Sequence, residues 1–91
     1  MGNRVTLIKR PDKLELEING IVVKNNFVSQ GYDSTTKSEI NTVIQGSDGQ
    51  DRLDGTYNID GTISFQNGDT NDAFDGTNQI HINFIDLSSG V

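Results

Sequence analysis

The chain of 91 residues contains no cysteine and no tryptophan, and it has a single histidine, a single methionine and a single proline. Without cysteine there can be no disulfide framework, no thiol nucleophile and no cysteine-based zinc site. One histidine cannot supply a multi-histidine metal site. These absences exclude disulfide scaffolds and the cysteine-rich or histidine-rich metal proteins.

Hydrophobic residues are also scarce, at 32% of the chain, against roughly 45–50% (Gly included) in an ordinary globular domain. The length corresponds to a single domain, residues 1–91. No apolar stretch reaches the length of a signal-peptide core or a membrane helix, so we expect cytoplasmic synthesis and no membrane partner. The net charge of −6 disfavours specific nucleic-acid recognition, which needs a basic surface.

Residues that favour turns are abundant: the chain has ten Asp, ten Asn and ten Gly. These residues oppose helix interiors, and no segment shows a sustained 3.6-residue hydrophobic period. Short apolar alternations between glycine-rich turns predict an all-β fold, a small antiparallel β-sandwich or barrel with about six short strands. Polar loops near residues 29–38 and 66–78 are expected to be flexible.

The first hairpin is predicted around Asn19-Gly20. Apolar residues alternate with charged ones before this pair, and an apolar run follows it. Asn-Gly between two such runs favours a type I′ turn, because both central residues need positive φ. A two-residue loop and a regular ladder predict three cross-strand pairs. These are Ile18 with Ile21, Leu16 with Val23 and, on the outer face, Glu15 with Lys24.

The second hairpin is predicted around Asp60-Gly61. A two-residue loop would split the aromatic residues between the two faces, whereas an odd-length loop brings Tyr57, Ile63 and Phe65 to one side. We therefore expect a three-residue or bulged turn with Gly61 in the left-handed conformation. Three further strands are expected at residues 4–9, 40–45 and 79–87.

Aspartate and glycine cluster between residues 46 and 77, in the segments QGSDGQDRLDG and TNDAFDG. Calcium takes six to eight oxygen ligands, which Asp side chains and the carbonyls of glycine-rich loops can supply. The first segment resembles the repeats-in-toxin calcium nonapeptide, and that resemblance implies Asp51 as a ligand. The candidate metal ligands are Asp48, Asp51, Asp54, Asp72 and Asp75.

A structural role is the alternative interpretation of these aspartates. The nonapeptide pattern does not continue into residues 55–63, although a calcium β-roll needs consecutive repeats because each ion lies between neighbouring turns. We therefore predict turns at the four Asp-Gly pairs and no cofactor, and calcium stays the alternative. The four pairs are at residues 48–49, 54–55, 60–61 and 75–76.

His81 is the one histidine, and it lies within an expected strand. A general base needs a hydrogen-bond partner and a pocket, and a chain this short and polar rarely forms a deep pocket as well as a core. Catalytic carboxyl groups need apolar pockets that raise their pKa, whereas these aspartates lie in polar segments. We predict that the protein is not an enzyme. A hydrolase that uses His81 with an Asp is a formal alternative.

Charge is unevenly distributed along the chain, with a net +1 on residues 1–45 and −7 on residues 46–91. A basic amino-terminal surface of one copy can therefore meet the acidic region of residues 46–76 of the next copy in a contact between unlike surfaces. Solvated charged faces are the alternative. The predicted interface residues are Arg4, Lys9, Arg10, Lys13 and, on an acidic loop, Phe74.

The order of these features also points to a family. KLELEINGIVV, EINTVIQG, DGTYNIDGTISF and a final apolar strand follow one another across residues 5–87. This order is similar to that of the small β-rich tail-tube and tube-like virion proteins of tailed bacteriophages, and the resemblance implies sheets that join copies into stacked rings. We therefore expect a non-enzymatic structural homo-oligomer that contacts other virion proteins. It would be a tail-tube, tail-associated or capsid-decorating component, and a small calcium-binding β-module using residues 46–77 is the alternative.

Overall fold

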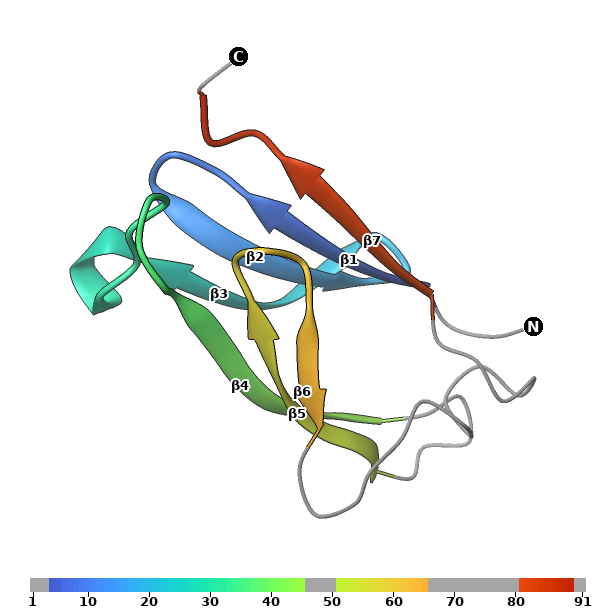
Figure 1. Cartoon of the computed structure of the whole chain (residues 1–91). Helices are drawn as coiled ribbons and strands as arrows, with labels where there is room; N and C mark the ends of the chain where they lie inside the picture. Colours follow the sequence, from blue (N-terminus) through green and yellow to red (C-terminus); the bar gives the residue numbers. More distant parts are fainter. Residues whose placement is uncertain (1–3, 46–50, 66–80, 90–91) are drawn as a thin grey trace.

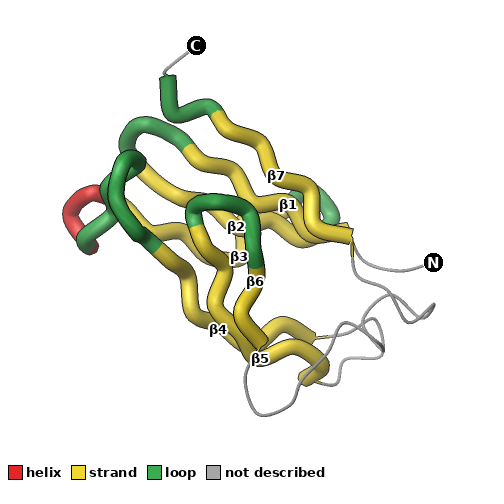
Figure 2. The backbone as a smooth tube through the Cα atoms, in the orientation of Figure 1, coloured by secondary structure: helices red, strands yellow, loops and turns green. Residues whose placement is uncertain are grey.

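A computed structural model describes residues 4–45, 51–65 and 81–89, which form two facing β-sheets (Figure 1). The strands are β1 (Arg4–Lys9), β2 (Lys13–Ile18), β3 (Ile21–Phe27), β4 (Glu39–Gln45), β5 (Asp51–Asn58), β6 (Ile63–Phe65) and β7 (His81–Asp86). One sheet has the order β3-β2-β1-β7 and the other the order β4-β5-β6. The only helical element in the described residues is the 3₁₀ turn η1 (Val28–Gln30) (Figure 2). The predicted all-β fold is confirmed.

One strand pairing departs from the predicted antiparallel arrangement. β7 runs parallel to β1, with Leu7 opposite Phe84, whereas the other pairs are antiparallel. Parallel strands need a long crossover connection, and the chain makes the whole three-stranded sheet before it returns as β7. In the described residues β7 pairs only with β1, so it is an outer strand of the four-stranded sheet.

The turn of the first hairpin forms as predicted. Asn19 has a φ of 54° and Gly20 a φ of 83°, the positive values of a type I′ turn, and Ile18 lies opposite Ile21. The Asn19 amide N–H donates to the carbonyl oxygen of Arg4 at 2.8 Å, and its side-chain oxygen accepts from the Arg4 amide at 3.0 Å. The turn thus also fixes the start of β1.

The ladder of this hairpin is not regular, so part of its predicted register is wrong. A β-bulge makes Leu16 lie opposite Lys24 instead of Val23, and Glu15 opposite Asn25 instead of Lys24. Val23 is the extra residue on β3. An extra residue changes the face on which every later side chain of the strand lies, and Lys24 consequently lies on the same face as Leu16.

The second hairpin confirms the predicted three-residue turn. The Asn58 amide donates to the carbonyl oxygen of Thr62 at 2.9 Å, which leaves three residues in the loop. Gly61 has a φ of 88°, the predicted left-handed conformation. Tyr57 therefore lies opposite Ile63, and both pack into the core.

Of the four predicted Asp-Gly turns, the structure describes two. Asp60-Gly61 forms its turn, whereas Asp54-Gly55 lies inside β5, where Gly55 has a strand partner on each side. The prediction of a turn at residues 54–55 is wrong, because pairing on both sides of a central strand outweighs a local turn preference. The pairs at 48–49 and 75–76 lie outside the described residues.

The polar segment between β3 and β4 is tied to the rest of the protein by hydrogen bonds. The buried Tyr32 donates its hydroxyl proton to the carbonyl oxygen of Arg10 at 2.6 Å. The Asp33 amide donates to the Ser38 hydroxyl at 2.9 Å. The flexibility expected for residues 29–38 stays a prediction, and residues 66–78 lie outside the described residues.

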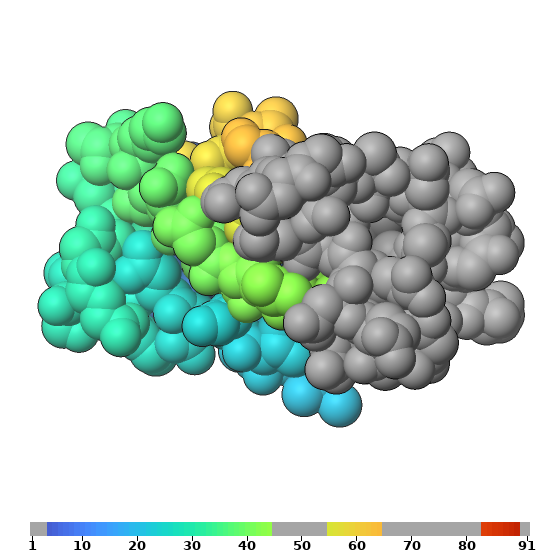
Figure 3. Space-filling model, turned by 90° about the horizontal axis from the view of Figure 1, so that it is seen from below, coloured from blue at the N-terminus to red at the C-terminus, as the bar shows by residue number. Residues whose placement is uncertain are grey.

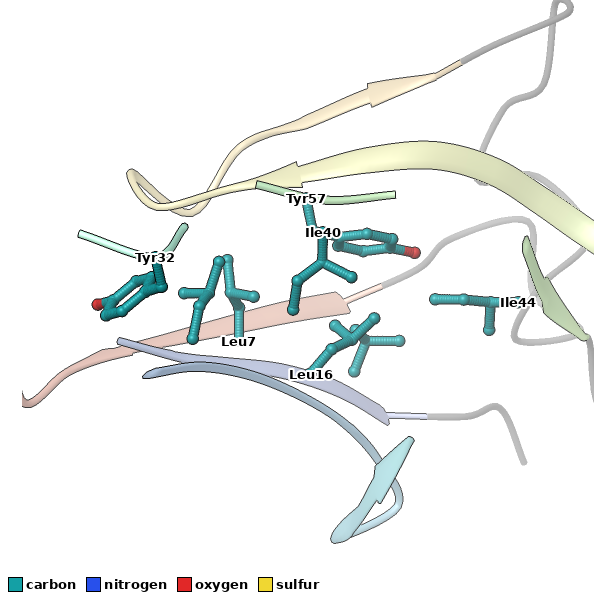
Figure 4. Close-up of a cluster of buried hydrophobic side chains, with 8 residues drawn as sticks. Leu7, Leu16, Tyr32, Ile40, Ile44 and Tyr57 are labelled. Carbon is teal, nitrogen blue, oxygen red and sulfur yellow. The ribbon is translucent and has the colours of Figure 1, made fainter. Parts of the chain in front are cut away.

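The hydrophobic core lies between the two sheets (Figure 4). Its buried members are Val5, Leu7, Leu14, Leu16, Tyr32, Ile40, Ile44 and Tyr57. Tyr57 is fully buried, and its hydroxyl has no hydrogen-bond partner among the described residues. That oxygen lies on the side of the ring that faces Ile44. Burial raises the pKa of Tyr57 above its ordinary value.

We predict that Tyr57→Phe stabilises the fold, because a buried hydroxyl without a partner is unfavourable. The free energy of unfolding should rise by about 1 kcal/mol in urea titrations at pH 7. The raised pKa means that the unfolded chain loses the tyrosine proton first, so wild-type stability falls as pH rises past about 10. Tyr57→Phe should weaken that fall. The control Tyr32→Phe loses a hydrogen bond and should be destabilised; a destabilised Tyr57→Phe would contradict the prediction.

A second prediction compares two glycines with positive φ. A Cβ atom on Gly61 would lie 2.8 Å from Cγ of Phe84, whereas one on Gly20 would meet nothing within 4 Å. Both Gly→Ala changes strain the backbone by about 1 kcal/mol, but only Gly61→Ala also displaces Phe84. Thermal unfolding should therefore show a larger loss for Gly61→Ala, and equal losses would mean that the contact is unimportant.

Candidate assembly surface

Large apolar side chains are exposed at the edges of both sheets. Within the described residues, eight of them are between 37% and 68% exposed. They are Ile21, Val22, Val23 and Phe27 on β3, Val28 directly after it, Val43 on β4, and Phe84 and Ile85 on β7. The inner strands β1 and β2, which the structure describes in full, have none. Apolar groups exposed on edge strands are typical of surfaces that contact another chain.

A groove of about 510 Å³ runs between β3 and β4. Figure 3 shows this face of the molecule, with the atoms of β3 beside those of β4. The groove is lined by Ile18, Ile21, Val23, Lys24, Thr42, Val43 and Ile44. Lys24 is the one charged residue of this lining, so the groove is apolar with a single ammonium group.

A second hollow, of about 430 Å³, lies between residues 35–37 and the second hairpin. It is lined mainly by hydroxyl and amide groups, and these bond to one another. The side-chain Nδ2 of Asn58 donates to the carbonyl oxygen and to the hydroxyl of Thr62, both at 3.1 Å. The Thr62 hydroxyl donates to Asp60 at 2.6 Å. These contacts stabilise the hairpin turn.

Two of the predicted basic interface residues lie on β1. Arg4 is exposed at its start, opposite His81 of β7 in the register. Lys9 lies at its end, with its Nζ 3.9 Å from Oδ2 of Asp86. Lys9 therefore has a carboxylate partner in its own chain, whereas Phe74 lies outside the described residues.

Arg10 and Lys13 lie at the turn between β1 and β2, and both contact Glu15. Arg10 Nε donates to Glu15 Oε1, and Lys13 Nζ lies 3.8 Å from the same oxygen. Glu15 is buried on the outer face of the sheet, and Lys13 also lies over the Phe27 ring, 5.5 Å from its centroid. The sequence missed these partners, and contact of the basic residues with another copy stays a prediction.

The candidate calcium ligands are only partly described. Asp51 lies opposite Gln45 and Asp54 opposite Val43, both in β5. Asp48, Asp72 and Asp75 lie outside the described residues. The described part of the chain holds no group of three or more His, Cys, Asp or Glu that could bind a metal ion. Calcium binding stays the untested alternative.

Three aspartates close turns by a pattern that the sequence analysis missed. Each carboxylate accepts from the backbone N–H and the hydroxyl of the residue two positions later, an Asx turn. The pairs are Asp33 with Thr35, Asp60 with Thr62 and Asp86 with Ser88, at 2.5–3.0 Å. These hydrogen bonds lower the pKa of each carboxyl group. Asp-x-Ser/Thr is the signal that would have found them.

Comparison with protein-family models, with curated proteins and with solved structures finds no match to this chain. None of the helical segments in the described ranges is long and apolar enough to cross a membrane. The candidate surface therefore rests on the geometry of the edge strands.

The contacts of Glu15 predict which charge reversals disturb the fold itself. Arg10→Glu would place a carboxylate beside Glu15 and should lower the free energy of unfolding by about 2 kcal/mol. Arg4→Glu, on an exposed side chain, should change it by less than about 0.5 kcal/mol. Urea titrations of both variants test this, and similar values would mean that the contact with Glu15 contributes little. If only Arg10→Glu destabilises the fold, Arg4→Glu is the variant for testing whether the basic surface contacts another copy, because its effect on assembly is not mixed with an effect on folding.

Proposed function

We propose that this protein is a non-enzymatic structural protein that self-assembles, as a component of a phage virion. One observation carries the proposal: the exposed large apolar side chains of the described residues lie on edge strands or directly after one. An isolated domain gains nothing from apolar groups at its sheet edges, and natural edge strands usually carry features that prevent pairing. Contact with further copies would remove these side chains from water.

The arrangement of the edges also suggests how the copies are related. β3 and β7 are the two outer strands of one sheet and differ in sequence. A contact between unlike surfaces repeats from copy to copy, and it closes into a ring or continues as a tube. Tail-tube, tail-associated and capsid-decorating proteins, which the chain resembles in the order of its features, all require such repeated contacts.

Self-assembly predicts a particle mass well above the 10.0 kDa of the chain. Sedimentation velocity and light scattering across a concentration series should show this mass, and electron microscopy should show rings or tubes. Because each copy carries a net charge of −6, added salt should strengthen association through apolar edges by screening repulsion between copies.

Two outcomes would count against the proposal. A monomer at every protein and salt concentration would contradict self-assembly. A melting temperature that rises with calcium and falls back with EDTA would instead support the calcium-binding module, because a ligand of the folded state stabilises it. If salt dissociates the assembly, charge pairs such as those predicted for the basic residues dominate the contact.

A further inference from the structure

The two outer strands of the four-stranded sheet run in the same direction. β7 is parallel to β1, β2 is antiparallel to β1, and β3 is antiparallel to β2. In the described part of the chain, β3 and β7 each have a strand on one side only. A second copy placed beside the first in the same orientation would therefore bring its β7 parallel to β3.

The side chains of β3 divide between the two faces of the sheet. Ile21 and Lys24 both line the groove towards β4, so they lie on the face that looks to the other sheet. Val22 lies opposite Glu17, on the outer face. The Val23 bulge is what places Lys24 on the inner face, because regular alternation from Ile21 would put it on the outer one.

The side chains of β7 follow a matching order, with an acidic residue where β3 has its lysine. Phe84 contacts Gly61 of the second hairpin, so it lies on the inner face. Asp86 lies on this face as well, paired with Lys9. Ile85 lies opposite Ile8, on the outer face. Along β7 the order is thus apolar inside, apolar outside and acidic inside.

Val23 is the extra residue of the bulge, so Val23 and Lys24 together count as one position along β3. With this count, one parallel register brings side chains of compatible chemistry together along β3 and β7. Its three pairs of β3 and β7 residues are Ile21 with Phe84, Val22 with Ile85, and Lys24 with Asp86. Each pair lies on one face, and the pairs are two apolar contacts and one of opposite charge, which are favourable across strands. A slip by one residue would put every pair on opposite faces.

We propose that β3 of one copy pairs in parallel with β7 of the next copy in this register, which continues the four-stranded sheet from copy to copy. This inference rests on the proposed self-assembly and names its contact. Among the described residues Lys24 has no ion-pair partner. The Asp86 side chain is 51% exposed beside Lys9, which leaves its carboxylate accessible to a second ammonium group.

A charge exchange between two variants tests this contact. Lys24→Glu and Asp86→Lys each create a like-charge pair, so each alone should raise the apparent dissociation constant about tenfold. An equimolar mixture should recover wild-type association, because the copies can alternate with opposite charges at every contact. Sedimentation velocity over a concentration series measures all three samples.

Lys37→Glu is the matched control, because it makes the same change in charge on an exposed lysine outside both edge strands. It should alter association much less than Lys24→Glu does. Asp86→Lys also removes the bonds from Ser88, so its fold is checked by circular dichroism. If Asp86→Lys unfolds, the charge exchange is made instead with Val22→Glu and Ile85→Lys. Both wild-type residues are 42% exposed, and they face each other in the proposed register.

Failure of the register and failure of the proposed function are distinguishable. If the wild type is assembled and Lys24→Glu behaves like Lys37→Glu, or the mixture of edge variants stays dissociated, the register is overturned and self-assembly stands. If Lys24→Glu associates more tightly with wild type than wild type does with itself, β3 meets β3 and the register is again overturned. A monomeric wild type overturns both.

Discussion

Packing between two facing sheets is the constraint on which the rest of this structure depends. Leu7 and Leu16 from one sheet meet Ile40 and Tyr57 from the other, and only 32% of the chain is hydrophobic. Two stacked sheets do not close on themselves, so their outer strands remain open to solvent or to another chain. Apolar residues are few in this chain, yet several of them lie exposed on those outer strands. This placement is the feature that needs a functional explanation.

Local sequence patterns predicted the turns of both hairpins. Asn19-Gly20 and Asp60-Gly61 gave their turns because Asn19, Gly20 and Gly61 adopt positive φ, a conformation that Asn and Gly tolerate by themselves. The direction of β7 could not be predicted, since it depends on which strand the chain meets after a long connection. Asp54-Gly55 has the same residues as Asp60-Gly61, yet it lies within a central strand. Local preference decides only where no tertiary pairing competes.

The candidate surface was harder to predict than the fold. The basic residues were visible in the sequence, but their partners were not: Lys9 meets Asp86 from the far end of the chain, and Arg10 meets Glu15 from the next strand. Alternation also gave the wrong neighbour for Lys24, because a bulge within a run of β-branched residues has no Gly or Pro to mark it. Side-chain partners across a sheet follow from register, and one extra residue changes the register.

That bulge also bears on the choice of partner. β-Bulges and lysines on edge strands commonly prevent indiscriminate pairing, and β3 has both, in Val23 and Lys24. They do not block every strand; they exclude those whose spacing or charge does not fit. A strand with two apolar residues followed by an acid fits when the bulge is counted, and β7 has this order. Under the proposed pairing, the irregularity of β3 would therefore make its contact with β7 selective, as an ordered assembly of copies requires.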